Sequence, residues 1–241
     1  MPGKRKRSIK WSPVLWTLFL MNTTLGLCFS RATSAVKVQV IGARDGDQSR
    51  IRKELVAMLK GTPAMRVLRN LLEEKLCFPT FVRSCRLQQN VFGRANLQME
   101  YREPVARLSS MDSVYLSTDG VFFAQVGIDK VLPILDLGLL PDCPNLGAVS
   151  RFETEDFAKA SRSIAIVGGF EECIVRSSGS EGLSVTAKEY GEVVLGSAGE
   201  LEQKIAKLKE IIADPHREIG PKSKLNLVSP THPAISTGTT H

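Results

Sequence analysis

The chain has 241 residues, of which 43% are hydrophobic and 24% are charged, so it can bury more than one core. Its net charge is +7 at pH 7, yet the first ten residues hold five cations and no acid, which leaves +2 for the other 231. The basic charge is therefore local, and the composition gives no support to nucleic acid as a partner.

The N-terminal region joins a basic tail, residues 1–12, to an uncharged and mostly apolar segment, residues 13–29. A helix over that segment would be roughly 26 Å long, close to a hydrocarbon core of about 30 Å. Trp11 and Trp16 lie at its basic end, where indole rings favour the headgroup layer. The pattern predicts a single transmembrane signal-anchor, with the N-terminus in the cytoplasm and the bulk of the chain on the other side.

A cleaved signal peptide is the alternative for the same region. Residues 22–24 are polar and interrupt the apolar run, and Thr33 and Ala35 are small residues at a spacing that a signal peptidase could use. The apolar run resumes over residues 25–29, which makes it long for the core of a signal peptide. We therefore expect the uncleaved anchor.

Residues 36–103 carry the order strand, helix, helix, strand, strand. Ser49 and Thr62 are suited to cap the two helices. The strands are recognised by apolar residues that alternate with polar ones. They fall at residues 36–40, 81–87 and 95–101. This order predicts an α+β domain in which two helices cover a three-stranded sheet.

Residues 104–228 are richer in strand patterns and predict a mixed, β-rich domain with flanking helices. Thr118-Asp119-Gly120 is a tight hairpin signal between two apolar runs. Ser197 and Glu200 fit a capping box at the start of the second helix. A final strand is expected over residues 224–228. Residues 229–241 have little to bury and predict a flexible tail.

The four cysteines beyond the N-terminal region are Cys77, Cys85, Cys143 and Cys173. Disulfides can form outside the cytoplasm, and Cys77 and Cys85 are the closest pair in sequence. Reduced, buried cysteines explain the same residues equally well. Their spacing does not match a zinc site, so no metal is expected.

No set of residues predicts an active site. The three histidines, His216, His232 and His241, all lie near the C-terminus, where a catalytic triad would need an ordered nucleophile beside one of them. Gly168-Gly169 is not followed by the Lys-Ser/Thr of a phosphate loop. We expect no enzyme activity, no cofactor and no small-molecule substrate. A binding or scaffolding protein is the default.

Several short stretches together resemble a known family. The first exported strand ends in Val40-Ile41-Gly42. Tyr101-Arg102-Glu103-Pro104-Val105-Ala106 is followed by Tyr115-Leu116-Ser117-Thr118-Asp119-Gly120-Val121-Phe122. Tyr190-Gly191-Glu192-Val193-Val194-Leu195-Gly196 precedes a helix, and Lys224-Leu225-Asn226-Leu227 follows it. In this order and spacing the chain resembles the bacterial cell-division proteins FtsQ/DivIB.

This resemblance implies a POTRA-like domain at residues 36–103 and a β-rich FtsQ/DivIB-type domain at residues 104–228. It also implies a non-enzymatic membrane scaffold at the division septum, in the bacterial inner membrane. The expected partners are small single-span coiled-coil proteins of the FtsB and FtsL type, together with other divisome proteins. Such a complex links early division proteins to septal peptidoglycan synthesis.

The expected mechanism is strand addition, in which a partner segment pairs with an exposed strand edge. The expected partner-binding residues are those of the last strand and one residue beside it: Lys224, Leu225, Asn226, Leu227, Val228 and Ile235. A strand that merely completes the sheet is the alternative. Family members often carry Asp and Arg where this chain has Asn226 and Val228, so the contacts at these two positions are expected to differ.

Two other functions remain as alternatives. One is another POTRA-bearing export or assembly protein, although such proteins usually repeat the POTRA unit or add a membrane barrel. The other is a secreted hydrolase with a cleaved signal, which would need an ordered histidine or a pair of carboxylates in a pocket.

Overall fold

The chain is α+β with mixed sheets, which confirms the predicted class. The structure is a computed structural model. It describes residues 11–31, 34–35, 37–63, 66–76, 79–90, 92–138, 146–147, 152–177, 182–216 and 219–237. The chain divides into two units, Met1–Tyr101 and Arg102–His241, each with its own hydrophobic core. Each unit is described by itself.

The first helix, α1, spans Trp11–Phe29. In the described part of the chain, no helix is both long enough and apolar enough to cross a membrane. The predicted transmembrane signal-anchor is therefore wrong, and so is the single-pass membrane topology. Residues 22–24 place three polar side chains within α1, and the prediction gave them too little weight. Residues 1–10 of the predicted basic tail lie outside the described residues.

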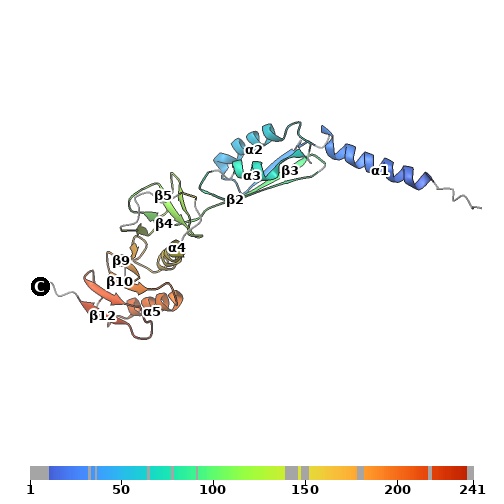
Figure 1. Cartoon of the computed structure of the whole chain (residues 1–241). Helices are drawn as coiled ribbons and strands as arrows, with labels where there is room; N and C mark the ends of the chain where they lie inside the picture. Colours follow the sequence, from blue (N-terminus) through green and yellow to red (C-terminus); the bar gives the residue numbers. More distant parts are fainter. Residues whose placement is uncertain are drawn as a thin grey trace, which may run out of the picture. The chain divides into compact units, whose positions relative to one another are not determined.

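After α1, unit 1 has the element order strand, helix, helix, strand, strand (Figure 1). Its elements are β1 (Lys37–Ile41), α2 (Asp45–Leu59), α3 (Arg69–Leu76), β2 (Val82–Gln89) and β3 (Arg94–Tyr101). The sheet order is β1-β3-β2, with β1 parallel and β2 antiparallel to β3. Helix α2 packs against β1, and α3 packs against β2.

Alternating burial explains the strands of unit 1. In β1, Val38 and Val40 are buried, whereas the residues on either side are exposed. Both helices begin away from their predicted caps. Helix α2 begins at Asp45, before Ser49, and α3 begins at Arg69, after Thr62. The residue before α2 supplies no side-chain capping bond, so packing of the apolar helix face decides where this helix begins.

In its described residues, unit 2 contains a nine-stranded sheet and two helices, α4 and α5. Its elements are β4 (Pro104–Leu108), β5 (Val114–Ser117), β6 (Phe122–Ala124), β7 (Ile134–Asp136), α4 (Phe152–Ile164), β8 (Ile174–Ser177), β9 (Leu183–Ala187), β10 (Gly191–Gly196), α5 (Leu201–Ala213), β11 (Ser223–Asn226) and β12 (Ala234–Thr237). The strand order is β12-β11-β10-β9-β8-β7-β4-β5-β6. Helix α4 packs against β4, β8 and α5.

The segment predicted as a flexible tail contributes a strand instead. Strand β12 pairs antiparallel with β11 and lies at one end of the nine-stranded sheet (Figure 1). Residues 229–233 make the turn that brings it back. The prediction was wrong because it judged the segment by how much apolar surface it could bury. An edge strand is held largely by backbone hydrogen bonds along one side and needs few buried side chains.

Two of the four cysteines beyond the N-terminal region are described, and both are reduced. Cys85 lies in the core of unit 1 and Cys173 in the core of unit 2. Burial raises the pKa of the Cys173 thiol to about 12, so it stays protonated and unreactive at neutral pH. Cys77 and Cys143 lie outside the described residues.

Candidate functional site

The candidate site is one end of the large sheet, where β10, β11 and β12 lie side by side and α5 connects β10 to β11. Strands β10 and β11 are parallel, and α5 forms the crossover between them. Gly191 begins β10 with φ of 73°, and a Cβ there would lie 2.2 Å from the carbonyl oxygen of Ser223. Only glycine permits this approach. Gly191, in the stretch 190–196 that contributed to the family resemblance, therefore lets β10 start directly beside β11.

A buried lysine fixes the other end of β10. The Lys204 side chain is 2% exposed, and its Nζ donates to the carbonyl oxygens of Leu195 and Ser197, each at 2.8 Å. Burial lowers the pKa of Lys204, and the charge of Glu200 offsets part of that shift. The ammonium thus holds the carbonyls of the β10–α5 connection against the first turns of α5.

The predicted capping box next to this lysine does not form. Helix α5 begins at Leu201, and Glu200 takes the left-handed conformation with φ of 55° and supplies no side-chain cap. The two bonds from Lys204 satisfy carbonyl oxygens, whereas the predicted box would have satisfied backbone N–H groups, so Lys204 holds the connection in a different way.

The predicted edge strand lies inside the sheet. Strand β11 has β10 on one side and β12 on the other, so Lys224, Leu225 and Asn226 do not form an open edge. Lys224 Nζ instead contacts Glu192 Oε2 of β10 at 3.5 Å. Among the remaining predicted residues, Leu227 is fully buried. The open edge is one strand further along the chain, in β12, which contains Ile235.

The direction of the backbone groups in β12 follows from the hydrogen-bond pattern that joins β11 to β10 and to β12. Leu227 N–H donates to the Val194 carbonyl at 2.8 Å, so alternate residues of β11 face β10. Lys224 and Asn226 must then face β12, where they pair with Ser236 and Ala234. The N–H and C=O of Ile235 consequently point away from β11, toward the open side of the sheet.

The side chains of β12 suit a shallow contact surface. Ile235 lies opposite the fully buried Leu225, yet its own side chain is 39% exposed. Ser236 Oγ donates to the Lys224 carbonyl at 3.3 Å, which secures β12 to its neighbour. Val228, beyond the end of β11, is 48% exposed. Within the described residues, a partner strand would therefore find both unpaired backbone groups and exposed apolar side chains at this end of the sheet.

The opposite end of the same sheet is partly covered. Strand β6 is the last strand there, and the carbonyl of Phe122 accepts a hydrogen bond from Gly147 N–H at 2.8 Å. Both Phe122 and Phe123 are buried. Of the two ends of the sheet, β12 therefore offers more unpaired backbone to a partner.

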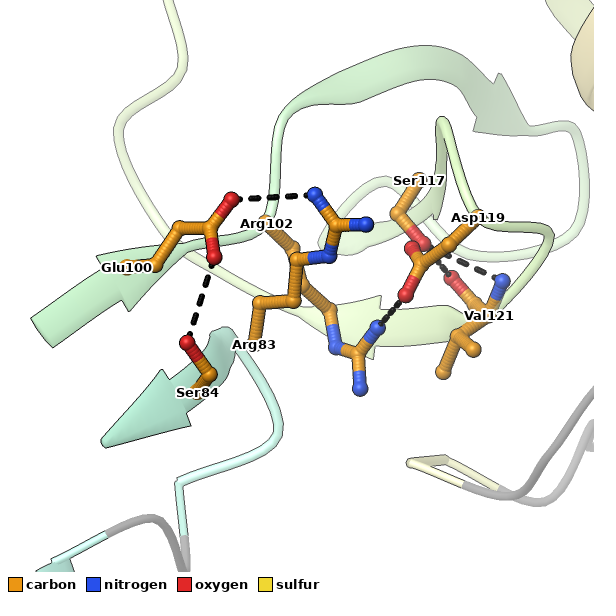
Figure 2. Close-up of polar contacts among 7 residues, drawn as sticks. All are labelled: Arg83, Ser84, Glu100, Arg102, Ser117, Asp119 and Val121. Atoms are coloured by element: carbon orange, nitrogen blue, oxygen red, sulfur yellow. Dashed lines mark hydrogen bonds and ion pairs between the residues drawn. The ribbon is translucent and has the colours of Figure 1, made fainter. Parts of the chain in front are cut away.

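The stretch that carried the family resemblance forms a local polar network. Arg102 pairs with the carboxylate of Asp119 in the predicted hairpin (Figure 2). Burial raises the pKa of Asp119, but hydrogen bonds from Ser117 and Arg102 and the charge of Arg102 outweigh it and lower the pKa. Ser117 Oγ also donates to the Val121 carbonyl at 2.7 Å, so the network stabilises the β5–β6 turn rather than presenting a reactive group.

The residues weighed for chemistry do not assemble in the described chain. His216 and His232 are exposed, and His241 lies outside the described residues. No three metal-binding side chains gather within the described ranges. The residues of the site that the prediction missed are Ser236 and Thr237. Their one sequence signal was the alternation of small and β-branched residues after Pro233.

No protein-family model matches the chain, and no curated protein matches it either.

Proposed function

We propose that the chain is a non-enzymatic binding protein of the FtsQ/DivIB type that acts in bacterial cell division. Its expected partners are small coiled-coil division proteins of the FtsB and FtsL type. Through them it would connect early division proteins to septal peptidoglycan synthesis. The observation that supports binding most directly is the open edge at β12, where the backbone of Ile235 faces away from β11.

The proposed mode of binding is strand addition. A partner segment would lie beside β12 and exchange backbone hydrogen bonds with Ile235, extending the sheet by one strand. Each bond adds about 1 kcal/mol net, so backbone pairing alone gives weak binding. The exposed side chains of Ile235 and Val228 would add apolar contacts and set which partner sequence fits.

Unit 1 has the strand and helix order of the POTRA-like domain that the resemblance implies. In the proposal it supplies a separate contact with other division proteins. Two dissimilar units, with sheets of three and nine strands, agree better with this arrangement than with an export protein built from repeated POTRA units.

The test is co-purification of the full chain with FtsB- and FtsL-type proteins from the same organism. Ile235→Pro removes the outward N–H and leaves the bonds to β11 in place, as edge positions permit. Losing that donor should cost about 1–3 kcal/mol, which weakens binding roughly 5- to 150-fold. Ile235→Val is the matched control, since it keeps the N–H and the β-branched shape.

Retained binding by Ile235→Val and loss by Ile235→Pro would support the proposal. Equal binding by both variants would show that β12 is not the contact. Failure of the natural chain to bind either division protein would overturn the proposed function itself, and capture of export components in their place would favour the POTRA-bearing alternative.

A further inference from the structure

Unit 1 has an open strand edge of its own, along β1. Lys37 N–H donates to the Gly93 carbonyl at 3.0 Å, so Lys37 and Gln39 face β3 in the parallel ladder. The backbone groups of Val38 and Val40 therefore face outward. Gln48 Nε2 donates to the Val40 carbonyl at 3.2 Å, as this alternation requires.

The other edge of the same sheet is occupied by side chains of α3. Glu73 Oε1 accepts from Leu87 N–H at 2.7 Å, and Arg69 Nη2 donates to the Gln89 carbonyl at 3.5 Å. These bonds take up outward groups of β2. Strand β1 is thus the edge of unit 1 with more unpaired backbone among the described residues.

A groove with a volume of about 1450 Å³ includes β1 and extends over the neighbouring strands. One wall is the face of α2 that carries Arg52, Lys53 and Val56. The other lining residues come from all three strands of the sheet: residues 37–40 of β1, residues 94–96 of β3, and residues 88–90 at the end of β2. The groove belongs entirely to unit 1, and β1, the strand with the open edge, contributes to its lining.

Every charged side chain that lines this groove is a cation: Lys37, Arg52, Lys53 and Arg94. All four are exposed, and none forms an ion pair with another described residue. Arg52 and Lys53 stand on the helix side of β1. Lys37 and Arg94 are partners in the ladder and share the opposite face of the sheet. Positive charge therefore lies on both sides of the open edge.

We propose that this groove binds an extended acidic segment of a partner protein, which adds as a fourth strand beside β1. Side chains of an added strand point alternately to the two faces, so carboxylates at successive positions would meet Arg52 and Lys53 on one face and Lys37 and Arg94 on the other. Its backbone would pair with the N–H and C=O of Val38 and with the N–H of Val40, whose carbonyl already accepts from Gln48.

A second copy of this chain is disfavoured as the occupant. Edge-to-edge pairing of two β1 strands would bring the cations of each copy against those of the other, and like charges that face each other across a sheet are destabilising. The proposal does not rest on the proposed division function, because it concerns a different unit and a different edge.

The charge test uses the full chain and a fluorescein-labelled peptide of about eight residues with Glu at successive central positions, so that both faces carry carboxylates, and Val at either end. Fluorescence anisotropy should show saturable binding that weakens when salt is raised from roughly 0.05 to 0.5 M. Arg52→Gln with Lys53→Gln should weaken it about 2- to 30-fold. The control, Lys60→Gln with Lys75→Gln, removes the same charge outside the groove and should leave binding unchanged.

The pairing test is residue-resolved hydrogen exchange of the natural chain. Peptide binding should slow exchange at the amides of Val38 and Val40, whereas those of Lys37 and Gln39, already directed to β3, should change little. The proposal is overturned if the peptide does not saturate, if a peptide of Val and Lys binds equally, or if the control variant loses as much affinity. Equal or tighter binding of a single-stranded oligonucleotide, without protection of Val38 and Val40, would also overturn it.

Discussion

Replacing Lys204 by Met tests how the β10–α5 connection is held. Methionine keeps most of the apolar stem but removes the ammonium that donates to the Leu195 and Ser197 carbonyls. Each charge-assisted bond contributes roughly 1.5–3 kcal/mol, whereas removing a buried charge returns several kcal/mol of desolvation cost. Because both bonds are short, we expect a net loss of about 2 kcal/mol, or a roughly 30-fold change in the folding equilibrium.

The assay must report on unit 2 alone. Both tryptophans, Trp11 and Trp16, lie in α1, so intrinsic tryptophan fluorescence does not follow this unit. Hydrogen exchange of α5 and β10 amides during urea titration gives a local measurement. A Lys204→Met chain as stable as the natural one, or more stable, would refute the view that the ammonium stabilises this connection.

Three other changes test the polar contacts and the packing of unit 2. Asp119→Asn should lower the free energy of unfolding by about 1–3 kcal/mol at neutral pH. Because the pKa of Asp119 is lowered in the folded state, the stability that its carboxylate contributes is present above the ordinary value of 3.8 and is lost as the pH falls through the folded-state pKa. The urea midpoints of the natural and Asp119→Asn chains should therefore converge in acid. Gly191→Ala should cost about 2 kcal/mol more than Gly61→Ala, which has the same positive φ but no neighbour within 4 Å, as thermal unfolding of both variants would show. Leu225→Ala, at a fully buried position, should cost about 2–5 kcal/mol by the same measurement.

The sequence predicted those elements whose pattern is local. Alternation identified the strands of unit 1, and the hairpin at Asp119 formed where the turn residues placed it. Helix starts were less predictable, because packing rather than a cap sets the start of α2, and the capping box expected of Ser197 and Glu200 does not form at α5.

The position of a strand within its sheet could not be predicted from the local sequence pattern. Residues 224–226 read as a strand and are one, but their place beside β12 depends on a turn over residues 229–233 that brings the chain back. The β1 groove was equally hidden, since Lys37, Arg52 and Arg94 come together only through parallel pairing of β1 with β3. The apolar content of a segment led to a wrong prediction twice, once for the membrane anchor and once for the flexible tail.

Residue-resolved amide exchange in β12, with an FtsB- or FtsL-type protein bound to the full chain, tests the central claim most directly. The outward N–H of Ile235 should exchange slowly in the complex and faster in the free chain, while the amides of Ala234 and Ser236, which face β11 in both states, should change little. A bound partner that leaves the exchange rate of Ile235 unchanged would contradict strand addition at this edge.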